Sequence, residues 1–135
     1  MSGPLLDRID IHMEVPAVQY RELRGGAVGE GSAEIRARVL AARERQLARF
    51  AKGSERIFSN AQMGTRQIRT YCELSADSER LLERAMQQQG LTARAHDRIL
   101  KVARTIADLE AKPNLEVAHI AEAIQYRTLD RSYWN

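Results

Sequence analysis

The sequence has little that would stabilise a secreted protein or hold a protein in a membrane. Its one cysteine, Cys72, excludes an internal disulfide and is typical of a reducing compartment. No apolar run approaches the ~20 residues that a membrane-spanning helix needs. The first residues also lack the apolar stretch of a signal peptide. We therefore predict a cytoplasmic protein with no membrane partner.

Aromatic residues are scarce, at 5% of the chain, so the core should be built from aliphatic side chains. The 135 residues suffice for one domain with a modest core. Apolar residues make up 44% and charged residues 29%, values typical of a folded protein. The formal net charge of +3 permits an anionic partner without requiring one.

Motifs of several enzyme classes are also missing. His12, His96 and His119 are scattered, with no partner at ligand spacing, so we predict no metal site. The chain has neither a Gly-x-Ser-x-Gly nucleophile motif nor a Gly-x-x-x-x-Gly-Lys-Ser/Thr phosphate loop. The glycines of "RGGAVGEGS" (24–32) indicate a flexible connector instead. By itself the chain should neither bind ATP tightly nor hydrolyse it, and we predict no cofactor of its own.

Helical periodicity dominates what is present, and it predicts a mainly α fold, an antiparallel helical bundle. The predicted helices cover residues 33–53, 64–71, 76–90, 92–112 and 115–129. Ile9–Val15 differs, because it alternates apolar and polar residues in the way of a half-buried β-strand. No second run offers this strand a partner, so it either pairs with something outside this chain or marks the chain as a piece of a larger protein.

Several residues predict where these helices begin, end and pack. Ser32, Ser75 and Thr92 are expected N-caps, Gly53 and Gly90 expected ends, and Pro113 forbids continuation of the long fourth helix. That helix has a regular apolar stripe formed by Ala95, Ile99, Val102, Ala103, Ile106 and Leu109. The first helix is expected to bury a less regular side, formed by Ile35, Val39, Leu40, Leu47 and Phe50.

Arginine is the residue type best suited to carry a function here, since its guanidinium stays charged and matches phosphate oxygens. Arg8 lies at the start of the predicted strand and Arg94 in the first turn of the long helix, both outside the apolar stripes. The first helix adds four candidate nucleic-acid contacts, which are Arg36, Arg38, Arg43 and Arg45. Taken alone, each of these residues also fits a solvated surface arginine.

Two longer stretches resemble a known family. "SGPLLDRIDIHMEVP" is similar to the end of the ATPase core in magnesium-chelatase-like AAA+ proteins, and "GLTARAHDRILKVARTIADL" to their second nucleotide-sensing helix. "AEIRARVLAARERQLARF", "NAQM" and "HIAEAIQYR" resemble the competence-protein ComM (YifB-like) subgroup. The resemblance covers nearly the whole chain, in order and with few gaps.

The resemblance implies a domain organisation and a set of partners. Residues 1–16 would be the last strand of an AAA+ core, 17–31 a flexible connector, and 32–135 the C-terminal helical lid domain. The remaining ATPase core would lie upstream of this chain. The intact protein would use ATP and Mg²⁺, assemble as a homohexamer, and act on DNA as a branch-migration helicase in recombination or transformation.

The resemblance also gives roles to two arginines. Arg8 in "LLDRID" matches the arginine finger, which acts in trans on ATP held by a neighbouring subunit. Arg94 in "TARAHDR" matches the sensor-2 arginine, which reads the same phosphate. Ile9 departs from the chelatase proper, which usually carries Phe after "LLDR", and this favours the ComM-like branch.

Two other functions stay open at this point. The chain fits a free-standing helical module that binds DNA or a protein through its arginine-rich faces. It also fits a subunit of a magnesium chelatase that inserts the metal into a porphyrin.

Overall fold

The computed structural model describes residues 3–25 and 29–127, and within these ranges all regular structure is helical. This confirms the mainly α prediction. The elements are α1 (Gly3–Arg8), α2 (Tyr20–Gly25), α3 (Ser32–Phe50), the 3₁₀ turn η1 (Asn60–Gln62), α4 (Thr65–Tyr71), α5 (Ala76–Gln89), α6 (Ala93–Leu109) and α7 (Val117–Gln125). None of the described helices is long and apolar enough to cross a membrane.

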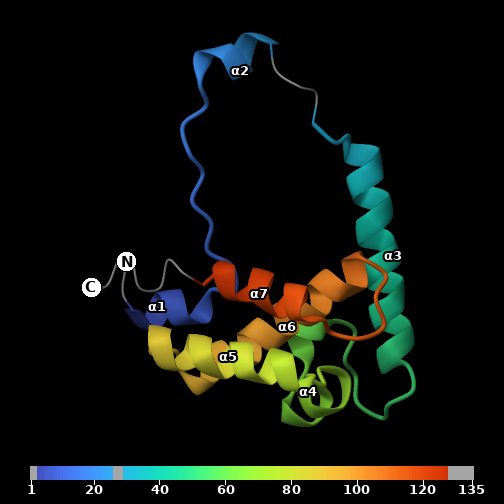
Figure 1. The fold of residues 1–135 in the computed structure, drawn as a ribbon. Helices are drawn as coiled ribbons and strands as arrows, with labels where there is room; N and C mark the ends of the chain where they lie inside the picture. Colours follow the sequence, from blue (N-terminus) through green and yellow to red (C-terminus); the bar gives the residue numbers. More distant parts are fainter. Residues whose placement is uncertain (1–2, 26–28, 128–135) are drawn as a thin grey trace.

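Helix α6 is the centre of the bundle (Figure 1), because its apolar stripe is buried as the spacing predicts. Ile99, Ala103 and Ala107 are completely inaccessible to solvent. Elements α3, η1, α4 and α7 all contact α6, and α5 packs on α7. The buried core around it consists of aliphatic side chains and Met63, apart from Phe50 and Cys72. Tyr71 and Tyr126 pack against its edge, and the rings of Phe50 and Tyr71 meet edge to face with centroids 5.6 Å apart. The expectation of an aliphatic core is therefore confirmed.

The ends of α5 and α6 follow from local sequence. The hydroxyl oxygen of Ser75 accepts a hydrogen bond from the Ser78 amide, and α5 ends at Gly90, where φ is +60°. Helix α6 ends before Pro113 is reached. Ala111 adopts a φ of +60°, the Lys112 amide donates to the Ala107 carbonyl and the Ala111 amide to the Asp108 carbonyl, which is a Schellman end.

The strand prediction for Ile9–Val15 is wrong. Residues 3–8 form α1, and residues 9–15 are irregular. Met13 and Val15 are exposed whereas His12 is buried, which is the reverse of a strand that buries its apolar face. The described residues provide no second extended segment as a partner, and the segment is held instead by isolated bonds such as His12 amide to Tyr126 carbonyl, 2.7 Å.

The expected connector also contains a short helix, since Tyr20–Gly25 forms α2. This helix buries none of its residues, and it lies at the far end of an arch that rises from the bundle (Figure 1). Gly26–Val28, at the centre of the glycine-rich stretch, lie outside the described residues. So do residues 128–135, which include the last part of the predicted final helix.

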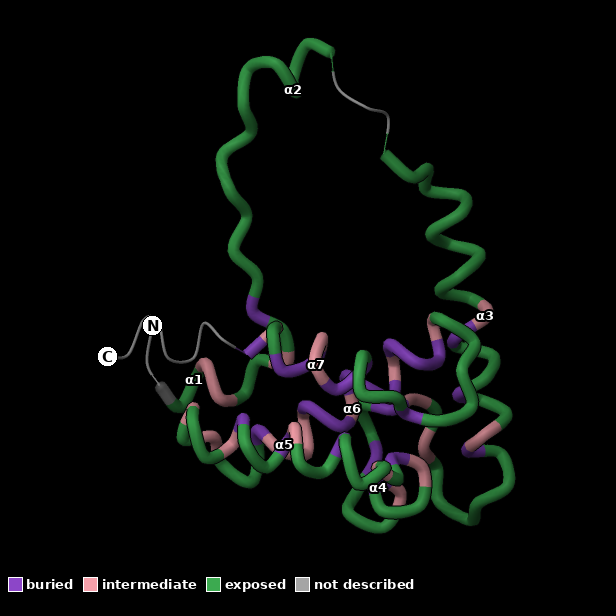
Figure 2. Tube along the Cα trace, viewed as in Figure 1, coloured by how far each residue is buried: buried purple, intermediate pink, exposed green. Residues whose placement is uncertain are grey.

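Helix α3 departs from its prediction in two ways. Its N-cap is Gly31 rather than Ser32, without a side-chain cap. Of its predicted apolar side only Phe50 is buried, and Ile35, Val39, Leu40 and Leu47 are exposed. Figure 2 shows the reason for the first three, because only the C-terminal half of α3 reaches the bundle; Leu47 lies in that half but is exposed.

Candidate functional site

The two arginines singled out in the sequence are brought to the same end of the bundle by one hydrogen bond. Thr92 caps α6 by accepting from the Ala95 amide at 3.2 Å, and its hydroxyl donates to Asp7 Oδ1 at 3.1 Å. Asp7 precedes Arg8 in α1, and Arg94 follows Thr92 by two residues. The end of α1 therefore lies against the beginning of α6, and Arg8 and Arg94 are close in sequence to the two residues that make this contact.

Arg8 and Arg94 are both exposed, and neither forms a hydrogen bond or ion pair with any other described residue. The carboxylates near them are already engaged. Asp7 lies 3.6 Å from Arg127 Nη2, and Asp10 forms an ion pair with Arg98. Two guanidinium groups are thus left to bind an external anion, and their planar forks suit phosphate oxygens.

A second set of contacts fixes the segment that carries Arg8. The side chain of Arg127, completely buried at the end of α7, donates from Nη1 to the Ile9 carbonyl at 2.7 Å. His12 donates from Nε2 to the Leu6 carbonyl at 3.0 Å. Asp10 adds its ion pair with Arg98 of α6. Polar contacts from Arg98 of α6 and from Arg127, after α7, therefore hold the segment that follows Arg8.

The four arginines of α3 do not form one surface. Residues two apart on an α-helix point about 160° away from each other, so Arg36 and Arg43 lie on one flank and Arg38 and Arg45 on the other. Arg38 pairs with Glu30, with two nitrogen–oxygen distances of 2.5 and 3.0 Å. Arg45 donates to the Asp108 carbonyl at 2.8 Å. Only the side chains of Arg36 and Arg43 have neither a hydrogen bond nor an ion pair with another described residue.

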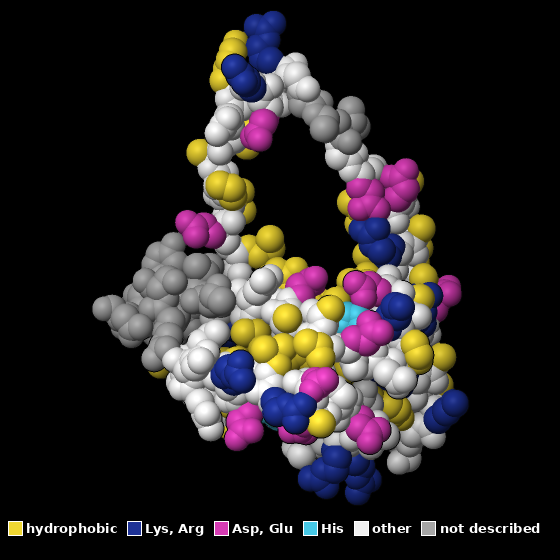
Figure 3. Space-filling model, viewed as in Figure 1, with side chains coloured by type: hydrophobic (Ala, Val, Ile, Leu, Met, Phe, Trp, Pro, Cys, Tyr) yellow, Lys and Arg dark blue, Asp and Glu magenta, His cyan; other side chains and the backbone are white. Residues whose placement is uncertain are grey.

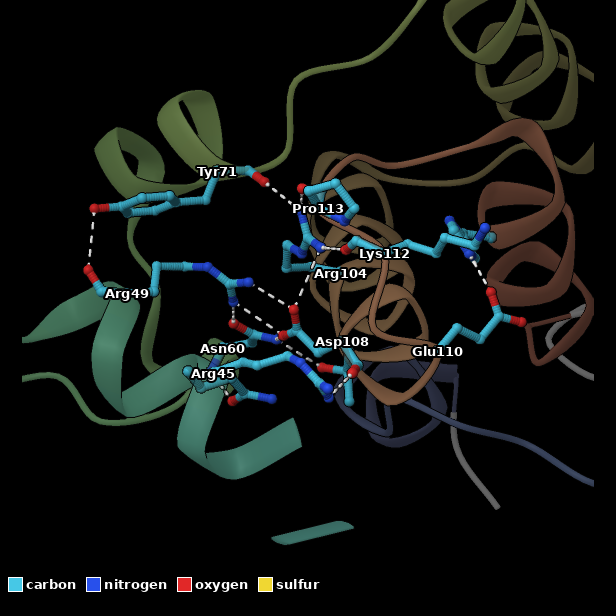
Figure 4. A network of polar contacts seen from close by, with 12 residues as sticks. Arg45, Arg49, Asn60, Tyr71, Arg104, Asp108, Glu110, Lys112 and Pro113 are labelled. Atoms are coloured by element: carbon cyan, nitrogen blue, oxygen red, sulfur yellow. Dashed lines mark hydrogen bonds and ion pairs between the residues drawn. The ribbon is translucent and has the colours of Figure 1, made fainter. Parts of the chain in front are cut away.

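A buried polar cluster that the sequence did not predict joins α3, η1 and α6 (Figure 4). At its centre is Asp108, which is 1% exposed. Its carboxylate accepts from Arg49 at 2.6 and 2.9 Å and from the Asn60 amide at 2.9 Å. Asn60 is the first residue of the "NAQM" stretch, so this motif holds η1 against Asp108. We call Asp108 and the side chains bound to its carboxylate the hub.

Arg104 extends this cluster to Tyr71, the last residue of α4. It is 3% exposed, lies 3.3 Å from Asp108 Oδ1, and donates to the carbonyls of Tyr71, Lys112 and Pro113. Burial lowers the pKa of the Arg104 guanidinium, and the Asp108 carboxylate opposes that shift. Because both its Nη groups are engaged by these buried partners, Arg104 is a structural arginine, whereas the side chains of Arg8 and Arg94 are exposed.

The remaining titratable groups do not gather into a site. In the ranges that the structure describes, no group of three or more His, Cys, Asp and Glu side chains is placed to hold a metal ion. Cys72 is buried, and burial raises the pKa of its thiol to about 11. His119 is enclosed between Glu110, 2.5 Å from its Nε2, and the Glu116 amide, 2.9 Å from its Nδ1.

Comparison with known proteins agrees with this architecture. Residues 29–127 match the family model described as "Magnesium chelatase, subunit ChlI C-terminal". The chain belongs to this family. It is a C-terminal part of a ComM/YifB-like protein of the magnesium-chelatase group, as the sequence motifs predict. The matched region includes Arg94 and the hub at Asp108, but not Arg8.

Three relatives show how widely the similarity extends. The chain is 42% identical to the YifB protein of Salmonella typhimurium, 41% to competence protein ComM of Haemophilus influenzae and 41% to YifB of Escherichia coli. Each similarity covers 97% of this chain and 25% of the relative. The chain thus spans about a quarter of the length of the curated relatives it matches.

Proposed function

We propose that this chain is the lid and arginine-supplying part of a ComM-like AAA+ motor. The observation that carries the proposal is the Thr92–Asp7 hydrogen bond, because it places two unpaired arginines at one end of the bundle. In this proposal residues 32–135 are the lid. Residues 1–16 belong to the ATPase core, and residues 17–31 connect the two.

The proposed roles follow from the chemistry of the two guanidinium groups. Arg8 extends from the molecule to ATP held by a neighbouring subunit and stabilises negative charge on the transferred phosphoryl group, a contribution worth about a thousandfold or more in rate. Arg94 contacts the same phosphate from the first turn of α6. Since α6 is the central helix of the bundle, a movement of Arg94 with nucleotide state moves the lid as a whole.

The partners in this proposal come from the rest of a longer protein. ATP and Mg²⁺ are held by the ATPase core, because this chain has no phosphate loop. Neighbouring copies complete the site, and a homohexameric ring is the arrangement in which every finger faces an ATP. DNA as the substrate, and branch migration in recombination or transformation as the activity, are what the resemblance to the ComM-like branch implies. The name of the Haemophilus relative, competence protein ComM, fits a role in transformation.

A second candidate, magnesium insertion into a porphyrin, is favoured by the description of the family model. Two assays of the longer protein with ATP distinguish branch migration from magnesium insertion. One assay supplies a labelled four-way DNA junction, and the other supplies a porphyrin and Mg²⁺. We expect ATP-dependent conversion of the junction into duplex products and no metalation of the porphyrin. Metalation with an intact junction would instead establish the chelatase activity.

A control variant makes this assay specific for the proposed mechanism. Arg8→Ala in the longer protein should abolish junction conversion, because the finger is required for turnover. Junction conversion that persists in Arg8→Ala at the normal rate, or that needs no ATP, would contradict the proposal.

A further inference from the structure

Of the arginines in the described ranges, only Arg104 and Arg127 are buried. The other described arginines are exposed or partly exposed, and Figure 3 shows Lys and Arg side chains spread among acidic ones over one face of the bundle. Burying a guanidinium group is costly unless hydrogen bonds and an opposite charge compensate for the lost water. The partners of these two arginines therefore indicate what each of them holds together.

The two buried arginines have partners in different parts of the chain. Arg104 binds within the bundle, because its ion-pair and hydrogen-bond partners all lie between residues 71 and 113. Arg127 follows the end of α7, and its side chain reaches the N-terminal segment. Its Nη1 donates to the Ile9 carbonyl at 2.7 Å, and its Nη2 lies 3.6 Å from Asp7 Oδ1. Arg127 thus joins the bundle to the beginning of the chain.

Asp7 and Ile9 lie on either side of Arg8 in the sequence. One buried guanidinium group therefore holds both the residue before Arg8 and the residue after it. The Arg8 side chain itself is exposed, and it forms no hydrogen bond or ion pair with another described residue. Because both neighbours are held, the backbone at Arg8 is restricted, and its exposed guanidinium projects in a narrow range of directions.

Other contacts of this segment restrain it less. The hydrophobic core contains no residue of α1 among those described. The ion pair of Asp10 with Arg98 is partly exposed, with 46% and 28% of the two side chains accessible, so water competes for it. The hydrogen bond from Thr92 to Asp7 is exposed as well. Arg127 differs because it is completely buried, where hydrogen bonds from a charged group are stronger.

We propose that Arg127 is a positioning residue for Arg8, which means that it fixes the direction in which the Arg8 guanidinium leaves the molecule. This inference rests on the proposed function in taking Arg8 as the arginine finger. A contact made in the transition state needs such precision, since a displacement of about 1 Å can cost about a hundredfold in rate. Helix α7 packs on α5 and α6, so Arg127 also makes the direction of the finger depend on the position of the lid.

ATP turnover by the longer protein tests this inference. Arg127→Lys keeps the positive charge but replaces the planar fork by one ammonium group, so it cannot bind Ile9 and Asp7 in the same geometry. Arg104→Lys, at the other buried arginine, is the matched control, and both are assayed below their melting temperatures. We expect Arg127→Lys to lower kcat about tenfold or more with KM for ATP unchanged, because the finger acts only in the transition state. Arg104→Lys should keep the wild-type kcat.

A nitroxide spin label on Arg8→Cys reports on the same segment without depending on ATP hydrolysis. The native Cys72 gives little background, because it is buried and its thiol has a pKa of about 11. The label should become more mobile when Arg127→Lys is added to Arg8→Cys. Its mobility should stay the same when Arg104→Lys is added instead.

Three results would overturn the inference: wild-type kcat in Arg127→Lys, an equal loss of kcat in Arg104→Lys, or a label whose mobility Arg127→Lys leaves unchanged. Should Arg127→Lys not fold, Asp7→Asn removes the charge of its partner, and unchanged kcat and label mobility in that variant would count equally against it. Wild-type turnover in Arg8→Ala would contradict the proposed function alone, and the mobility of the label would then decide whether Arg127 fixes this segment.

Discussion

Asp108 is the residue at which three elements of the bundle, α3, η1 and α6, meet. Its carboxylate pairs with Arg49 of α3 and lies 3.3 Å from Arg104 of its own helix, and its carbonyl accepts from Arg45. A buried carboxylate of this kind is retained only when its charge is matched. The two guanidinium groups provide that match, and Asn60 satisfies a further lone pair.

Removing this carboxylate should therefore be costly. Asp108→Ala leaves Arg104, and most of Arg49, buried with uncompensated charge, which costs about 3–5 kcal/mol of the free energy of unfolding. Urea unfolding of the 135-residue chain measures the change. Asp77→Ala, which removes an exposed ion pair with Arg80, is the control and should cost less than ~1 kcal/mol. Equal losses in the two variants would contradict a central role for Asp108.

At this scale the sequence predicts side-chain exposure better than it predicts partners. Arg8 and Arg94 lie outside the apolar stripes and are exposed, as their positions indicate. The roles of Asp7, Asp10 and Arg127 could not be predicted, because their partners are 85 to 118 residues away in the chain. Contacts between residues so far apart in the chain depend on the whole fold, so no local sequence pattern predicts them.

Among the elements, the most accurate predictions are those in which local chemistry and burial agree. Helices α5 and α6 have capping hydroxyls and defined ends, and α6 has a regular apolar stripe, and the structure confirms these predictions. The periodicity of α3 correctly predicts a helix, but of the five apolar residues expected on its buried side only Phe50 is buried. The alternation of Ile9–Val15 misled for a related reason, since a strand depends on a partner that the described chain does not contain.

Thr92 stabilises the beginning of α6 directly, because its hydroxyl caps this helix and also binds Asp7 of α1. Thr92→Ala removes both hydrogen bonds, and we expect a loss of about 1 kcal/mol or slightly more in the free energy of unfolding. Thr92→Ser keeps the hydroxyl and should remain close to wild type. Thermal unfolding of both variants measures the difference. A serine variant as unstable as the alanine variant would show that the methyl group, not the hydroxyl, is what matters.

On the scale of the whole molecule, the chain combines a packed bundle with an open arch. The bundle buries the hub at Asp108 and the stripe of α6, whereas the arch and the upper half of α3 bury almost nothing (Figure 2). Arg8 and Arg94 lie where the N-terminal segment meets the bundle. A change in how this segment sits on the bundle would therefore move Arg8 relative to Arg94, which is part of α6.

The central claim concerns what these two arginines do, and ATP turnover by the longer protein tests it most directly. Arg8→Ala should lower the hydrolysis rate by about a thousandfold or more while nucleotide binding stays nearly unchanged, because the finger acts in trans. Arg94→Ala should weaken hydrolysis without a large fall in melting temperature, since its side chain is exposed. Arg66→Ala, an exposed arginine of α4, is the matched control and should behave as wild type. Wild-type turnover in Arg8→Ala, or an Arg94→Ala variant that loses its fold, would contradict the account.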